Sequence, residues 1–464
     1  MSVPESSLNR LGGLACLLWL VISPAARAVP AFARQTGQAC MACHVSFPEL
    51  TPYGRMFKLS GYTIGSRLTH LPVALMVQVG DTGVRNNRDD QGNQVVPKTD
   101  SVQLSAASLF LAGKISDNAG GWIQWTYNNL NVNDAGQTVG HSGIDNTDLR
   151  LVGRVVDADN TTVRWLYGLT LNNNPTVQDA WNSTPAFGFP FTLPPNMISP
   201  AAATMFDGSL AQQVAGIGGY VFWNRSLYFE LSGYRTADGV LSWLRAGQDI
   251  HTPGGVHRLA GTNPYWRFAW NHEWGPHSLM LGTYGMRVRV YPDNTMPFTP
   301  TDRFTDIAID AQYQYITDPH TVTLEATRIH ERQDYAASFP ATMAGSPIGA
   351  GPAPANLRDT LNTTKLKVTY YFQRKYGATL AWFSTTGSAD PGLYPPGSVG
   401  GSLNGRPDTR GFIPEIDYLP IPNLRLMLQY YDYRKFNGGT TNYDGAGRSA
   451  RDNNTWFLNL WFAY

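Results

Sequence analysis

The chain has 464 residues, of which 15% are charged and 12% aromatic, and its 35 lysines and arginines almost balance its 34 acidic residues. Soluble domains usually contain about 25% charged residues, and a chain without basic excess is not expected to bind nucleic acid. The three cysteines cannot form a disulfide framework, because Cys40 and Cys43 are the only two beyond residue 28 and lie close together.

The first 28 residues have the pattern of a cleaved signal peptide. Arg10 supplies a positive charge, an apolar run extends from Leu11 to Ile22, and Ala26-Arg27-Ala28 places small residues at the cleavage positions. The run is shorter than the ~20 apolar residues that a membrane-spanning helix needs. We therefore expect an exported protein whose mature chain begins near Val29.

The segment Cys40-Met41-Ala42-Cys43-His44 is the strongest chemical motif in the sequence. Two thiols at this spacing can add to the two vinyl groups of one haem, and the adjacent histidine then serves as the proximal iron ligand. A thioredoxin-like motif would open a helix in a βαβ unit, and a structural zinc ion needs four ligands. The sequence has neither context, so we predict one covalently bound haem c on Cys40, Cys43 and His44.

Residues 29–72 are predicted to form a small cytochrome segment around this motif. Thr51 can cap a helix that begins at Pro52, and Gly61 can end it. A segment of this size rarely folds alone, so we expect it to plug the lumen of a neighbouring barrel. The cations Arg55 and Lys58, with Arg34 and Arg67, are candidate partners for the haem propionates; solvated surface charge is the alternative.

The second axial iron ligand is the least explicit feature of the segment. Methionine raises the potential of a haem, and Met56 lies on the predicted helix, so it is the first candidate for the distal ligand. The alternative for Met56 is a space-filling core residue. His70 is a second candidate, and a ligand from the barrel lumen or water remains open.

Residues 73–464 alternate between apolar and polar positions in short segments separated by Gly, Asn, Asp and Pro. In Tyr265 to Glu273 the aromatic residues oppose polar ones, and in Phe304 to Ile316 the isoleucines oppose Asp306 and Asp310. In Ser278 to Val290 we expect Met280 and Met286 to face lipid, and Arg287 and Arg289 to face water. The last residues alternate up to an aromatic C-terminus, Tyr464. We predict an all-β protein, an antiparallel transmembrane outer-membrane β-barrel of about 16 strands.

Two regions resemble the fused monohaem cytochrome–porin family of iron(II)-oxidising bacteria. They are the segment from Ala31 through the haem motif to Pro48–Thr63, and residues 172–181 with 187–191. The resemblance implies an iron(II) oxidase in the outer membrane. Such a protein takes electrons from extracellular iron(II) through a single haem and passes them to a periplasmic c-type cytochrome or another periplasmic carrier.

Two other functions stay open from the residues alone. One is a redox conduit for a different extracellular donor, and the other is a porin whose haem only stabilises the plug. The side chains of Arg287, Arg289, Asp306 and Asp310 could line an iron path in the lumen, since carboxylates suit iron(II). Charges of opposite sign on neighbouring strands could equally pair with each other.

Overall fold

The computed structural model describes residues 31–66, 72–96, 102–132, 138–157, 159, 162–253, 256–349 and 351–464. The predicted signal peptide, Arg67 and His70 lie outside these residues. None of the helices in the described ranges is long and apolar enough to cross a membrane.

Sixteen strands of the described chain form one closed antiparallel barrel, which confirms the predicted architecture and strand number. Each strand pairs with its neighbour in sequence, and the last strand pairs with the first to close the ring. The strands are β3 (Val73–Val84), β4 (Gln103–Lys114), β5 (Ala119–Val132), β6 (Thr138–Val156), β7 (Val163–Asn172), β8 (Val214–Trp223), β9 (Leu227–Thr236), β10 (Asn263–Trp274), β11 (His277–Val290), β12 (Asp302–Ile316), β13 (His320–Asp334), β14 (Arg358–Phe372), β15 (Tyr376–Gly387), β16 (Thr409–Ile421), β17 (Leu424–Lys435) and β18 (Thr455–Ala463).

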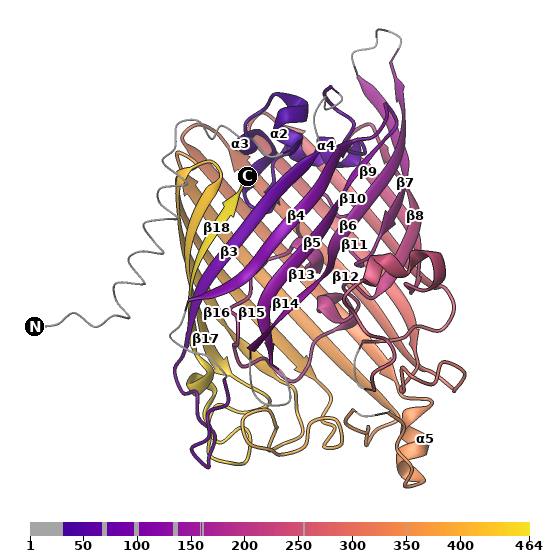
Figure 1. Cartoon of the computed structure of the whole chain (residues 1–464), viewed down its shortest axis with the longest axis vertical. Helices are drawn as coiled ribbons and strands as arrows, with labels where there is room; N and C mark the ends of the chain where they lie inside the picture. The colour runs from indigo at the N-terminus through magenta and orange to yellow at the C-terminus, as the bar shows by residue number, and fades with distance from the viewer. Residues whose placement is uncertain are drawn as a thin grey trace, which may run out of the picture.

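The two ends of the barrel differ in the length of their connections. Short turns such as residues 373–375 and 422–423 lie at one end, beside the C-terminus, and long connections such as residues 388–408 lie at the other. Figure 1 shows the helices α2, α3 and α4 gathered at the short-turn end, while α5 (Ser338–Met343) lies at the long-loop end. The long-loop end also carries the short helices η3 (Gly239–Arg245) and η4 (Ala450–Asn453).

The outer surface of the barrel is apolar and the lumen is largely polar. On β10, Phe268 is 42% exposed while the neighbouring Arg267 is fully buried, and on β12, Ile309 is 62% exposed while Asp310 is buried. These faces agree with the alternation predicted for both strands. A closed barrel pairs its backbone groups within the sheet, so such an apolar exterior can lie in lipid.

The predicted faces of β11 are wrong. Met280, Tyr284 and Met286 are buried inside the barrel, whereas Arg287 and Arg289 point outward near the long-loop end of the strand. The cause is a connection that fills the lumen. Residues 173–213, called the lumenal strap here, run from β7 to β8 through the barrel interior and carry η1 (Pro185–Phe187) and η2 (Met205–Ser209).

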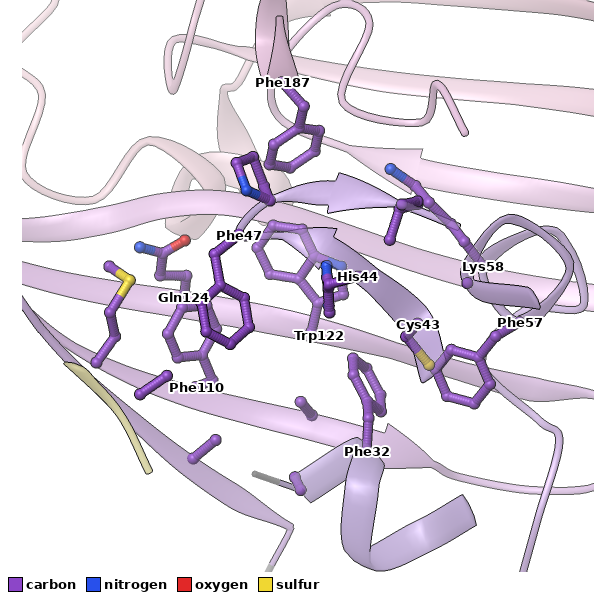
Figure 2. Close-up of a pocket in the computed structure, with 18 of the residues that line it drawn as sticks. Phe32, Cys43, His44, Phe47, Phe57, Lys58, Phe110, Trp122, Gln124 and Phe187 are labelled. Carbon is purple, nitrogen blue, oxygen red and sulfur yellow. The ribbon is translucent and has the colours of Figure 1, made fainter. Parts of the chain in front are cut away.

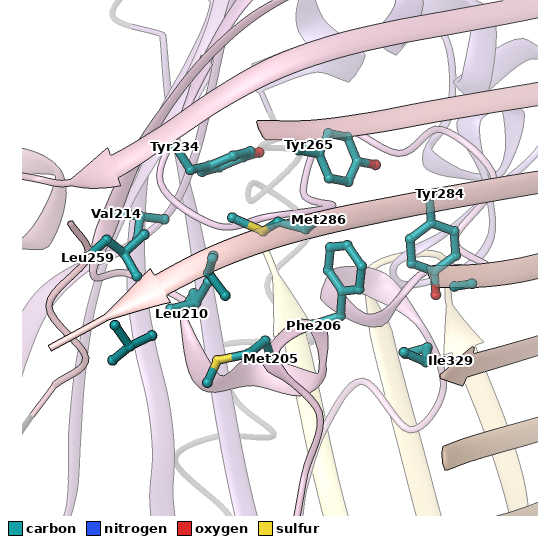
Figure 3. Packing of buried hydrophobic residues seen from close by; sticks show 13 residues of the cluster. Met205, Phe206, Leu210, Val214, Tyr234, Leu259, Tyr265, Tyr284, Met286 and Ile329 are labelled. Carbon is teal, nitrogen blue, oxygen red and sulfur yellow. The ribbon is translucent and has the colours of Figure 1, made fainter. Parts of the chain in front are cut away.

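The strap contributes its own apolar residues to the lumen. Figure 3 shows Met205, Phe206 and Leu210 of the strap beside Tyr234, Tyr265, Tyr284 and Met286 of the barrel. The rings of Phe206 and Tyr284 lie 5.1 Å apart. The apolar face of β11 is therefore buried against the strap, and no contact with lipid is needed to explain it.

Residues 31–66, called the plug here, lie against the inner wall. They form α2 (Ala31–Thr36), α3 (Cys40–Cys43), β1 (His44–Ser46), β2 (Glu49–Leu50) and α4 (Pro52–Leu59). The helix α4 confirms its prediction, since Thr51 Oγ1 accepts the hydrogen bond of Gly54 N and Gly61, with φ of 65°, follows its end. Gly54 is required because a Cβ atom there would collide with the carbonyl oxygen of Cys43.

Candidate cofactor site

The plug and the barrel wall enclose an apolar cavity at the short-turn end. About 1210 Å³ of space, counting its open mouth, lies between residues of the plug, of the strap and of β3, β4, β5 and β18. Figure 2 shows rings from the plug (Phe32, Phe47, Phe57) and from the barrel (Phe110, Trp122) around His44. A flat, mostly apolar group can be held by such a set of aromatic rings.

The predicted haem-attachment residues belong to this cavity. Cys43 and His44 line it, and Cys40 lies one turn earlier in α3, on the same side of the helix as Cys43. Both cysteines are free thiols and partly exposed. Burial raises the pKa of Cys43 to about 11, so this side chain is a neutral thiol.

His44 has the protonation state that an iron ligand requires. Burial lowers the pKa of its imidazole to about 4, so the ring is neutral at ordinary pH and has a lone pair to donate to a metal. Its Nδ1 is buried without a hydrogen-bond partner among the described residues. A neutral imidazole on the cavity wall is the form in which histidine can donate a lone pair to a metal.

Trp461 is a second polar donor in the cavity wall. Its side chain is only 4% exposed, and its Nε1 has no hydrogen-bond partner in the described chain. A buried N–H without an acceptor is costly and rare in native proteins. An occupant with a polar edge, such as the carboxylate of a haem propionate, would satisfy it. The aromatic walls, the thiols, the neutral imidazole and this donor all fit a haem.

Lys58 reaches the cavity, but Arg55 does not line it. Lys58 Nζ donates hydrogen bonds to the carbonyl oxygens of Val177 and Asp179, at 2.6 and 2.7 Å, and lies 4.7 Å from the ring centre of Phe187. Burial lowers its pKa to about 8. The strap thus holds Lys58 at the cavity edge.

Arg55 is anchored in the barrel wall. Its guanidinium donates hydrogen bonds to the Oε1 atoms of Gln312 and Gln314, at 2.6 and 2.9 Å, and to Ser278 Oγ at 2.5 Å. Burial lowers the pKa of Arg55 to about 10. These contacts attach α4 to β11 and β12, which favours an anchoring role over contact with a propionate.

The structure places the predicted distal ligand, Met56, outside the cavity lining. Met56 packs against the buried cluster that contains Leu59, Tyr220 and Met280, which favours its alternative role as a core residue. The methionine in the cavity wall is Met76 of β3, which is 8% exposed. Sequence reasoning missed Met76 because it lies in the barrel, although strand alternation could have placed it inside.

The two lumenal carboxylates considered for an iron path already have hydrogen-bond donors, and one of them is in an ion pair. Asp310 accepts from Arg267 at 2.8 Å and from Ser183 Oγ at 2.5 Å. Asp306 accepts from the backbone N–H of Phe206. Among the described residues no group of three or more His, Cys, Asp and Glu side chains could hold a metal ion. With Arg287 and Arg289 outside, the four charges considered for an iron path do not form one.

A series of stacked rings connects the strap with His44. The ring centres of Phe187 and Phe191 lie 5.7 Å apart, and those of Phe191 and Trp461 lie 5.6 Å apart. Trp461 then stacks on Phe47 at 5.8 Å, and Phe47 lies 5.2 Å from the His44 ring. The rings of strap, barrel and plug therefore form one continuous contact that ends at the cavity.

The comparisons with known proteins concern the barrel alone. No family model and no curated protein sequence matches the chain. Similar solved structures include Salmonella typhi OmpF in complex with daunomycin (10% identity, TM-score 0.49, covering 84% of this chain and 97% of that chain). Another is the outer membrane channel DcaP of Acinetobacter baumannii (12% identity, TM-score 0.42, covering 84% and 96%). The outer membrane protein OmpT of Vibrio cholerae is a third (8% identity, TM-score 0.42, covering 84% and 96%).

Proposed function

We propose that the protein is an outer-membrane monohaem electron-transfer protein that oxidises extracellular iron(II). The observation that carries this proposal is the position of the haem-attachment motif: Cys43 and His44 lie in the wall of an apolar cavity between plug and barrel. A haem bound there supplies a one-electron acceptor. The family resemblance of residues 31–63 supplies the substrate.

The chain's own residues have three tasks in this function. Cys40 and Cys43 attach the cofactor, and His44 donates its neutral nitrogen to the iron. The rings of Phe32, Phe47 and Phe57 give the cavity apolar walls, which would favour the less charged, reduced state of a haem. No acid, base or nucleophile is needed, because outer-sphere electron transfer makes no bond to the substrate.

The orientation of the barrel supports the proposed direction of electron flow. Outer-membrane barrels have short turns on the periplasmic side and long loops outside. The plug lies at the short-turn end, so a cofactor there would be close to a periplasmic c-type cytochrome. Iron(II) would remain on the loop side of the lumen, and the insoluble product would not enter the cell.

The proposal is tested with purified protein in two steps. Haem should remain on the polypeptide in a denaturing gel, and replacing both Cys40 and Cys43 with Ala should abolish the haem stain. Under anaerobic conditions, iron(II) should then produce the spectrum of the reduced haem within the mixing time. A persistent oxidised spectrum in protein that dithionite does reduce would reject the iron oxidase.

A porin with a structural haem plug is the second candidate function. The observation that favours it is the closed barrel itself, which is the architecture of general pores. The mixing experiment separates the two functions, because a structural haem need not react with iron(II). Conductance in planar bilayers adds a second criterion. A porin should conduct ions through an open lumen, whereas an electron-transfer protein with a filled lumen should conduct poorly.

A further inference from the structure

A second cavity lies in the barrel lumen on the loop side of the strap. It contains about 1640 Å³ of space, counting its opening, and no residue of the described plug lines it. Its walls are the strap on one side and the inner faces of β13 to β17 on the other. The lining extends to the loop ends of the strands, since Thr385 lies close to the end of β15 and Thr409 begins β16.

The strap is the partition between this cavity and the cofactor cavity. Asn182 and Phe191 line both cavities, so at these positions the partition is one residue thick. Asn182 Oδ1 also accepts the backbone N–H of Leu50 in the plug at 2.9 Å, which holds the partition against the plug. The stack from Phe191 through Trp461 to Phe47 continues from this partition to His44.

The polar groups of the second cavity suit a hydrated ion and not a bare one. Its carboxylates are already paired with lysines, with Asp207 2.6 Å from Lys365 Nζ and Glu325 2.9 Å from Lys367 Nζ, which also contacts Glu49 of the plug at 2.6 Å. The remaining polar wall includes the hydroxyls of Thr327, Thr363 and Thr385. Hydroxyls can bind the water shell of a cation, whereas carboxylates paired to lysine are poor ligands for its metal.

We propose that this cavity is the donor chamber, where a hydrated iron(II) ion gives up its electron across Phe191 and Trp461. The inference rests on the proposed function. One electron leaves hydrated iron(II), which becomes iron(III), and one ferric centre at the cofactor site becomes ferrous; no bond forms or breaks. Because electron transfer slows steeply with distance, the chamber brings the donor to the partition, while the strap keeps iron away from the plug.

The test introduces a cysteine into the chamber as Thr385→Cys, with Ala203→Cys on the strap as a second chamber variant. Both positions line the chamber. The matched control is Ser398→Cys, an exposed position in the loop between β15 and β16. The barrel has no cysteine of its own, so each introduced thiol is unique once haem occupies Cys40 and Cys43. A small cationic methanethiosulfonate reagent added to intact cells should label all three.

The second step blocks the chamber in purified, haem-loaded protein with a polyethylene-glycol maleimide. Reduction by iron(II) should slow about tenfold or more in the two chamber variants, because diffusional access of the donor is lost. The rate of reduction by iron(II) should be unchanged in the loop control. Dithionite should reduce the haem in all samples, because it can reach the haem from the plug side.

The inference is overturned if the small reagent labels neither chamber cysteine. It is also overturned if the blocked chamber variants react with iron(II) at the rate of the unblocked protein. The proposed function fails in a different way, since iron(II) would then not reduce even the unmodified wild-type protein. The labelling of intact cells reports access to the chamber independently of any reaction at the haem.

Discussion

Trp461 combines two properties that bear on the cofactor cavity. Its ring lies between Phe191 of the strap and Phe47 of the plug, and its Nε1 is buried without an acceptor. On the same strand, Trp456 faces outward and is 37% exposed. The C-terminal strand therefore supplies one tryptophan to the cavity and another to the lipid-facing surface, and substitutions of the two can be compared directly.

Replacing Trp461 with Phe should have different effects on the haem-bound and haem-free proteins. The ring stack survives, but the N–H donor is removed. We expect a loss of about 1 kcal/mol of unfolding free energy in the haem-bound protein, where a haem carboxylate would accept this hydrogen bond. In the background with both cysteines changed to Ala, stability should be unchanged or higher, because an unsatisfied group is removed. Denaturant titration measures the unfolding free energy in both backgrounds. The control Trp456→Phe should change this free energy equally in the haem-bound and the haem-free protein.

The distal iron ligand can be decided between Met56 and Met76. Met76 lines the cavity, whereas Met56 packs in the cluster with Leu59 and Tyr220. Met76→Leu should abolish the weak near-infrared band of methionine-to-iron charge transfer and lower the midpoint potential, since a Met ligand raises it. Met56→Leu, which conserves volume, should leave both unchanged. The reverse result would restore Met56 as the ligand.

At the scale of elements, alternation predicts strands well but does not say what covers each face. The faces of β10 and β12 follow from the sequence because aromatic or aliphatic residues oppose charged ones. On β11 both faces carry apolar residues and the outward arginines lie near the long-loop end of the strand, so the same rule fails. What decides β11 is the strap, whose residues Met205 and Phe206 fill the lumen, and a long connection shows no signal of lying inside a barrel.

The site was predictable only where its chemistry is local. The spacing of Cys40, Cys43 and His44 indicates haem attachment from sequence alone. Met76 enters the cavity from the first barrel strand and Trp461 from the last. Their meeting depends on how the barrel closes, which places Trp461 opposite Gln78. Closure also determines that Arg55 meets Gln312 and Gln314 and lies away from the cavity lining.

Arg55 should be the main anchor of α4. Arg55→Met removes the three hydrogen bonds of the guanidinium. The amide oxygens of Gln312 and Gln314 then lose this donor in a buried site. We expect a loss of roughly 2–4 kcal/mol in plug docking. The measurement is protease cleavage within residues 31–66 of the folded protein, which should accelerate. Arg164→Met is the control, because its ion pair with Asp157 is exposed and such pairs contribute about 1 kcal/mol or less. Equal cleavage of both variants would contradict the anchoring role.

For the whole molecule, plug and barrel depend on each other unequally. The plug makes many of its polar contacts with the barrel wall, as in Lys367 with Glu49 at 2.6 Å and Arg425 with the carbonyl oxygen of Phe47 at 2.7 Å. The barrel closes through β18 and β3, and β3 begins at Val73, after the plug. The plug therefore needs the barrel as its core, whereas barrel closure does not use the plug.

Deletion of residues 31–66, with the signal segment retained, should give a barrel that assembles and conducts. Strand pairing and the apolar exterior remain, so the variant should reach the membrane and show the gel mobility shift of a folded barrel on heating.

Single-channel current in planar bilayers should be clearly larger than that of the full chain, in which the plug occupies the short-turn end. The strap stays in place and should keep the conductance of this variant below that of an empty barrel. A further deletion within residues 182–208 should therefore raise the current again. A plug deletion that folds but conducts no better than the full chain would show that the strap alone closes the lumen, and would contradict a closing role for the plug.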